Sequence, residues 1–188
     1  MPPPAPLPRP ADEEDADAET QAQYLNQLRR VDAACSAAAA KALNTFLHAM
    51  LRWDKSNNDG AFTPPVAQAW PEVADEYLAA IQHPMSLQDM QAKLAAGAYA
   101  FGTLPGGDGD GGGGEGAAPA PQLRYDARSW ELVMADIELI GANCVAFNKG
   151  DGEWVKAAAA FRAHAERHVE NLRNAGEAPG AKPARRRR

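Results

Sequence analysis

The chain has 188 residues, a formal net charge of −6 and two cysteines, a length that suits one well-filled core and is too short for two domains. No apolar run approaches the roughly 18 to 20 residues that cross a bilayer, and the proline-rich first ten residues carry no apolar signal core. We therefore expect a soluble, intracellular protein with no membrane partner.

Composition points to a helical protein. Alanine, a strong helix former, supplies much of the 45% hydrophobic fraction, and segments rich in Val, Ile and Thr that announce strands are missing. The predicted fold class is all-α. Cys35 and Cys144 each lie within a helical apolar pattern, which predicts buried thiols in a reducing compartment and favours neither a disulfide nor a metal site.

Charge is unevenly placed along the chain. Residues 12–19 form an acidic block, whereas Lys182 and residues 185–188 form a basic tail. An acidic domain is a poor binder of duplex DNA, so we expect no direct sequence-specific nucleic-acid binding, but it attracts a lysine-rich peptide at long range. The basic tail is interpreted first as a nuclear-localisation signal; an anion-binding arm and a solvated tail are the alternatives.

The first predicted helix follows a disordered tail. Residues 1–20 combine prolines with acidic side chains and offer little to bury, so the folded domain should span residues 21–174. Apolar residues then recur three and four apart until the helix ends near Trp53 and Asp54. They are Leu25, Leu28, Val31, Cys35, Ala38, Ala42, Phe46 and Met50.

Residues 61–85 are rich in apolar and aromatic side chains yet contain four prolines, so no long helix can run through them. Phe62, Val66 and Ile81 are too apolar for an exposed loop. We expect a long irregular segment folded over the core, of a kind that is uncommon unless it is functional. A loop that merely covers the bundle end is the alternative, but it leaves the Tyr77 phenol in need of a partner.

A short helix and a flexible insertion are predicted next. Ser86 and Asp89 resemble a capping box, and they open a helix that ends at Gly97. Residues 102–122 are too glycine-rich to form a packed element. This insertion has no phosphate-loop lysine and no complete calcium-loop pattern, so it is interpreted as a tether.

Two longer helices follow, at about residues 126–147 and 153–173, which brings the number of main helices to four. Residues 175–188 are expected to be a disordered basic tail.

His164 and His168 lie one turn apart, but no third ligand accompanies them, so we interpret them as part of a solvated helix face and expect no metal or other cofactor.

Asn148 ends the apolar stripe of the third main helix, six residues before Trp154 starts the next. Burying an amide without partners costs roughly 1 to 3 kcal/mol. An inward asparagine at the end of a helix therefore implies a hydrogen-bonding partner, which can be a ligand. A helix C-cap is the alternative, since Asn148 and Gly150 suit left-handed backbone conformations.

In this order, the features resemble the bromodomain family over about residues 25–172. Residues 62–66 match the family's Phe-x-x-Pro-Val shelf, and residues 81–87 are similar to its Ile-x-x-Pro-Met-Asp-Leu motif, with Tyr77 seven residues before Pro84. Asp136, Ile140, Asn143 and Asn148 complete the pattern. The pattern is closest to the bromodomain-PHD-finger branch, and the resemblance implies a left-handed four-helix bundle.

The departures from the family pattern are few. Gly60 and Ala61 replace the common Trp-Pro, which predicts a more open groove wall, and Ser86 replaces the aspartate after Pro-Met. Phe147 stands where many members have tyrosine. The glycine-rich insertion lengthens a connection that is usually short.

The resemblance implies a reader of acetylated lysine. Asn148 is expected to donate a hydrogen bond to the acetyl carbonyl, and Tyr77 to reach the same oxygen through a water. Phe62 and Val66 are expected to pack on the acetyl methyl, and Trp154 on the lysine stem; Phe147 completes the predicted site. The implied partners are acetylated histone tails or other acetylated peptides, together with chromatin-associated proteins, in the nucleus.

Two other functions are weighed against this one. A helical scaffold with a vestigial groove could bind partners through its charged tails or through its first helix, which has an alanine-rich face at residues 37–40. An enzyme is the weakest interpretation, because a neutral amide and a phenol cannot act unaided as a base near pH 7. His48 and His83 have no Ser, Cys or Asp constellation around them, so no catalytic residue is predicted.

Overall fold

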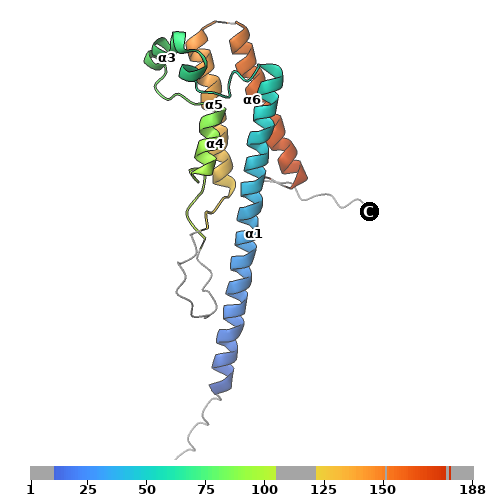
Figure 1. Ribbon diagram of the computed structural model, residues 1–188. Coiled ribbons are helices and arrows are strands. Elements are labelled where there is room, and N and C mark those ends of the chain that lie inside the picture. Colours follow the sequence, from blue (N-terminus) through green and yellow to red (C-terminus); the bar gives the residue numbers. More distant parts are fainter. Residues whose placement is uncertain (1–10, 105–121, 151, 177, 179–188) are drawn as a thin grey trace, which may run out of the picture.

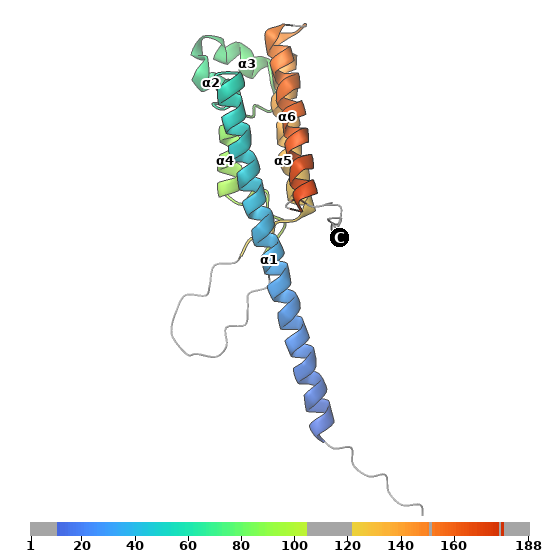
Figure 2. The ribbon, with the colours of Figure 1, turned by 90° about the vertical axis from the view of Figure 1, so that its right-hand side faces the viewer.

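The computed structural model describes residues 11–104, 122–150, 152–176 and 178. Within these residues, the secondary structure is helical, with one isolated antiparallel bridge between Thr103 and Leu123. The main helices are α1 (Ala11–Asn57), α4 (Leu87–Ala95), α5 (Ala127–Asn148) and α6 (Glu153–Ala175). Figures 1 and 2 show these four helices side by side, with the α5–α6 turn at one end of the bundle.

The four main helices share one hydrophobic core. Helix α5 lies along α6, and α1 packs against both α4 and α6. Each helix presents apolar side chains to the interior at the three- and four-residue spacing of an amphipathic helix. The fully buried ones include Leu43, Phe46 and Met50 of α1, Leu87 and Met90 of α4, Val133 and Ile137 of α5, and Phe161 and Ala165 of α6.

Helix α1 is longer than the bundle and extends well beyond it (Figures 1 and 2). It begins at Ala11, not near Thr20, so the expected disorder of residues 1–20 is wrong for residues 11–20; residues 1–10 lie outside the described residues. The sequence of residues 11–20 contains several alanines, whose high helix propensity favours this earlier beginning.

The N-terminal half of the predicted α1 stripe is not buried. Leu25, Leu28 and Val31 are 47%, 46% and 54% exposed, because the other helices do not reach that far along α1. Cys35 is exposed as well, so its prediction as a buried thiol is wrong.

The other helix ends lie within a few residues of their predicted positions. Ser86 caps α4, where its hydroxyl accepts a hydrogen bond from the Asp89 N–H at 3.1 Å. Asp126 caps α5 in a reciprocal capping box with Ser129. Helix α6 ends at Ala175 and is capped by Gly176, which has a φ of 81°, a conformation that glycine adopts without strain.

The segment between α1 and α4 is less irregular than expected. It contains α2 (Val66–Ala69), a 3-10 turn η1 (Pro71–Val73) and α3 (Ala74–Ala80). Pro65 and Pro71 precede or open these short helices, where a missing N–H costs nothing. The prolines thus divide the segment into short helices instead of removing helix from it.

The two ends of the glycine-rich insertion are paired with each other. The Leu104 N–H donates to the Gln122 carbonyl at 2.8 Å, and Leu104 is buried, so the predicted flexible segment is ordered at residues 102–104 and 122. Residues 105–121 lie outside the described residues. The same holds for 177 and 179–188 of the predicted basic tail, whereas Ala178 is buried against the core.

The described residues contain no helix that is both long enough and apolar enough to span a membrane.

Candidate functional site

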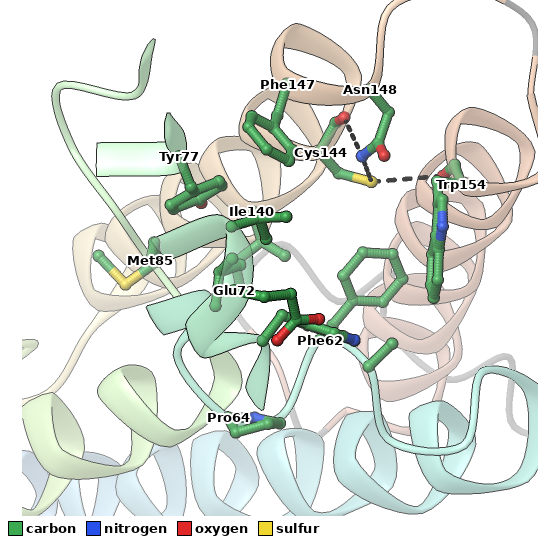
Figure 3. Close-up of a pocket in the computed structure, with 14 residues that line it drawn as sticks. Phe62, Pro64, Glu72, Tyr77, Met85, Ile140, Cys144, Phe147, Asn148 and Trp154 are labelled. Carbon is green, nitrogen blue, oxygen red and sulfur yellow. Dashed lines mark hydrogen bonds between the residues drawn. The ribbon is translucent and has the colours of Figure 1, made fainter. Parts of the chain in front are cut away.

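A cavity of about 240 Å³ opens at the end of the bundle where the α1–α4 segment meets the α5–α6 turn. Figure 3 shows Tyr77 and Met85 on one side of it and Trp154 on the other. All six residues predicted for the site, Phe62, Val66, Tyr77, Phe147, Asn148 and Trp154, line this cavity. The structure therefore brings the predicted residues together, while their roles toward a ligand stay a prediction.

Asn148 is the last residue of α5 and lies at the rim of the cavity. Its side chain is exposed, so the expected burial of the amide is wrong. The Nδ2 atom donates to the Cys144 carbonyl, one turn back, at 2.8 Å and lies 3.6 Å from the Cys144 Sγ. Asn148 thus closes its own helix and lines the cavity, so the two interpretations of this residue are compatible.

The turn after Asn148 keeps the amide at the rim. Lys149 and Gly150 both have positive φ, 47° and 90°, so the chain reverses within two residues. The Cys144 thiol donates to the Trp154 carbonyl at 3.4 Å, which links α5 to the first turn of α6. Burial raises the pKa of this thiol, which keeps it a neutral donor.

The Tyr77 ring is almost fully buried and meets Phe147 edge to face, with ring centroids 5.2 Å apart. Burial raises the pKa of the phenol, and the neighbouring Asn143 side chain lowers it by less. The hydroxyl is therefore a neutral hydrogen-bonding group over the ordinary pH range. Asn143 itself is buried, and its Nδ2 donates to the His83 carbonyl at 2.8 Å, which fixes the end of the α1–α4 segment to α5.

Asp54 holds the Phe62 wall of the cavity in place. This fully buried carboxylate at the end of α1 accepts hydrogen bonds from the Phe62 N–H at 3.1 Å and the Thr63 hydroxyl at 2.8 Å. The carbonyls of the same two residues accept the N–H groups of Leu87 and Gln88 at the start of α4, each at 2.9 Å. The Phe62 backbone is thus held by both α1 and α4.

The Trp154 side of the cavity is more open. Trp154 is 44% exposed and meets Trp70 edge to face, with ring centroids 6.0 Å apart. Trp70 lies in the segment that was expected to fold over the core, but it was not among the predicted site residues. Its position just before Pro71 was the available signal, since the proline begins the turn that directs the chain back over the cavity.

Several lining residues were not predicted: Ala61, Pro64, Trp70, Glu72, Val73, Met85, Ile140 and Cys144. Most of them are apolar, and the sequence pattern placed Ile140 and Cys144 on the core-facing stripe of α5. Glu72 differs from these residues because it is charged and exposed. Its position in the sequence gives no indication that it lines a cavity.

The histidine pair of α6 is not simply solvated. His164 stacks on Trp53 with ring centroids 4.9 Å apart, and His168 lies 5.8 Å from Phe46. Burial lowers the pKa of both rings. Among the described residues, no group of three His, Cys, Asp or Glu side chains is arranged to hold a metal ion.

Comparison with known proteins gives the family. The bromodomain family model matches residues 46–160, more than half of the chain. Among solved structures, the Trypanosoma brucei protein BDF5, solved with PF-CBP1, is 22% identical, with a TM-score of 0.49 and an alignment that covers 68% of this chain and 87% of that one. No curated protein sequence matches.

The family match accounts for the helical bundle described above. The matched region begins at Phe46, within the buried part of α1, and ends within the first turns of α6. The cavity and the segments that enclose it thus fall inside the matched residues. The chain belongs to the bromodomain family, and its fold is the all-α bundle of these acetyl-lysine reader modules.

Proposed function

We propose that this protein binds acetylated lysine of histone tails in the cavity at the α5–α6 end of the bundle, with Asn148 as the hydrogen-bond donor. One observation carries the proposal: a single cavity contains the amide of Asn148, the phenol of Tyr77 and the apolar walls of Phe62 and Val66. These groups match the carbonyl, the bound water and the methyl that an acetylated lysine presents.

The Asn148 amide has hydrogen-bonding capacity to spare. One N–H is taken by the Cys144 carbonyl, and the 3.6 Å contact that remains is to a sulfur, which is a weak acceptor. An acetyl carbonyl is a stronger acceptor and displaces that contact at little cost. Tyr77, neutral and almost fully buried, donates through a water to the same oxygen.

Selectivity for the acetylated side chain follows from desolvation. An unmodified lysine ammonium that entered this mostly apolar cavity would lose its hydration. Unless a carboxylate paired with it, this loss would cost roughly several kcal/mol. The Asn148 amide and the Tyr77 phenol, which are proposed to meet the acetyl group, carry no charge. The neutral acetyl group avoids this cost and satisfies the amide of Asn148, so the modified lysine is preferred.

The affinity for a single mark is expected to be micromolar or weaker, because the ligand buries little area. With that affinity, the protein acts as a recruitment module in the nucleus, where acetylated chromatin supplies several marks close together. Its net charge of −6 favours the encounter with cationic histone tails.

The experiment that tests the site compares two asparagines with the same local geometry. Asn57 ends α1 as Asn148 ends α5: each is exposed, and each donates its Nδ2 to a carbonyl four residues back at 2.8 Å. Only Asn148 of the two lines the cavity. Acetylated and unmodified histone peptides are titrated by calorimetry against the wild type, Asn148→Ala and Asn57→Ala.

We expect Asn148→Ala to weaken binding of the acetylated peptide by about tenfold or more, since a ligand-facing amide is lost. Asn57→Ala should bind as the wild type does, and the unmodified peptide should bind none of the three measurably. Equal binding of acetylated and unmodified peptides, or equal effects of the two substitutions, would refute the proposed site.

One observation favours the scaffold alternative. Tyr24, Leu25, Leu28 and Val31 expose a continuous apolar face on the part of α1 that lies beyond the bundle. If partners bind there, polar substitutions at Leu28 and Val31 should abolish partner binding while leaving acetyl-peptide binding intact. The two functions can coexist, because the face lies beyond the end of the described bundle that is opposite the cavity.

A further inference from the structure

Glu72 stands out among the residues of the cavity. It is the one charged side chain among the described residues that line the cavity, and every neighbour there except Tyr77 and Asn148 is apolar or a thiol. Figure 3 shows its carboxylate between the Met85 side of the cavity and Phe62. Within the described chain, this carboxylate has no hydrogen bond and no ion pair.

The backbone holds Glu72 in this position. It is the middle residue of η1, which begins at Pro71 with its fixed φ. The Trp70 N–H donates to the Val66 carbonyl at 2.8 Å, and the Val73 N–H donates to the Trp70 carbonyl at 3.2 Å. A short, hydrogen-bonded turn therefore fixes the Glu72 backbone beside the cavity.

An unpaired carboxylate beside apolar walls attracts a cation. The attraction between unit charges grows as water is excluded, and an apolar cavity excludes water from one side of the pair. Lys149 and Lys156 are the basic residues close to the α5–α6 turn. Neither lines the cavity, and Lys156 is paired with Glu153 at 2.9 Å. Glu72 is exposed and has no cationic partner within the described residues, so a cationic side chain of a bound peptide can pair with it.

We propose that Glu72 is a specificity-determining residue that selects acetylated lysines with an unmodified lysine or arginine close by in the same peptide. This inference rests on the proposed function and extends it, because the acetylated lysine has lost its own charge and cannot supply the cation. Arginine suits the position best, since its guanidinium can donate two parallel hydrogen bonds to one carboxylate.

The test is a cycle of three proteins and two peptides. The 188-residue wild type, Glu72→Gln and Glu76→Gln are titrated with an acetylated peptide in which arginines flank the acetylated lysine. The second peptide is the same except that citrulline, a neutral isostere, replaces those arginines. Glu76 is the matched control: it is an exposed glutamate of α3, four residues away, that does not line the cavity.

We expect the wild type to prefer the arginine peptide by about twofold to fivefold, the range of a solvent-exposed ion pair. The preference should shrink in Glu72→Gln, persist in Glu76→Gln, and fall as salt concentration rises. Both glutamine variants should bind the citrulline peptide as the wild type does.

The outcomes separate this inference from the proposed function. If neither acetylated peptide binds the wild type, the proposed function fails. If both bind and Glu72→Gln keeps the full preference for arginine, or weakens both peptides equally, the assignment of Glu72 is overturned while the acetyl-lysine site stands.

Discussion

Asn143 and Asn148 lie five residues apart on α5 and use their amides in different ways. Asn143 is buried, and its Nδ2 donates across the fold to the His83 carbonyl at 2.8 Å. Asn148 is exposed, and its Nδ2 donates to its own helix. The first amide holds two segments together, whereas the second stabilises only the last turn of α5 and keeps the remaining capacity for a ligand.

The comparison shows that polar groups around this cavity divide into those that build it and those that face into it. Asn143 and Asp54 belong to the first kind, because their partners are backbone groups of the segment that encloses the cavity. Asn148 and Glu72 belong to the second kind. Substitutions of the first kind should lower stability, and substitutions of the second kind should change binding alone.

Asp54→Ala is expected to have the largest effect. Burial raises the pKa of this carboxyl, while its hydrogen bonds with Thr63, Asn58 and Phe62 lower it by less. Removing the carboxylate leaves the Phe62 N–H buried and unpaired, so the free energy of unfolding should fall by about 3 kcal/mol. Urea denaturation measures it, and acetyl-peptide affinity should fall too because Phe62 is loosened.

Asp32→Ala is the control for that substitution. Asp32 is also an aspartate of α1, but it is partly exposed and pairs with Arg124 at 3.4 Å, so its loss should cost at most about 1 kcal/mol. A cost for Asp54→Ala no greater than for Asp32→Ala would show that Asp54 does not build the cavity.

Asn143→Ala is expected to cost about 1.5 kcal/mol, since the bond to the His83 carbonyl is lost from a buried amide. Asn148→Ala should change the free energy of unfolding by less than about 0.5 kcal/mol, as is usual for an exposed side chain. The two variants are compared by urea denaturation and by peptide titration. The distinction fails if Asn148→Ala is the more destabilising of the two.

Much of the fold could be predicted because it depends on local patterns. The capping residues Ser86 and Asp126, and the apolar periods of α5 and α6, fix helix positions from a few neighbouring residues. The outward extent of α1 could not be predicted in the same way. Its apolar spacing continues through Leu25 and Val31, and burial depends on whether other helices reach that far.

The site shows the same limit. Phe62, Tyr77 and Asn148 were placed together through their resemblance to a family motif, which encodes a three-dimensional arrangement that spacing alone does not. The exposure of the Asn148 side chain and the position of Glu72 in the cavity lining were not predicted. Both depend on how the turn at residues 149–150 and η1 direct the chain, and these turns follow from positive φ values and tertiary hydrogen bonds.

The smallest expected effect concerns polar groups of α6 that neither bind the ligand nor hold the cavity. Burial lowers the pKa of His164, with smaller contributions from His168 and Arg167, and burial and Arg52 do the same for His168. The unfolded rings, with an ordinary value of 6.5, take up protons first as pH falls. The stability that the neutral pair contributes is therefore complete above pH 6.5 and is lost as pH drops through the lowered pKa values.

Replacing both histidines by glutamine should make the free energy of unfolding fall less steeply below pH 6.5 than it does in the wild type. Urea denaturation at a series of pH values measures the slope, which matters more than the absolute stability because the variant also loses the stacking of His164 on Trp53. Acetyl-peptide affinity should be unchanged at every pH, since neither histidine lines the cavity. If the slope is the same in the variant, the two histidines have the same pKa in the folded and unfolded protein. If the wild type binds the acetylated peptide in a pH-dependent way and the variant does not, then the histidines affect binding although they do not line the cavity.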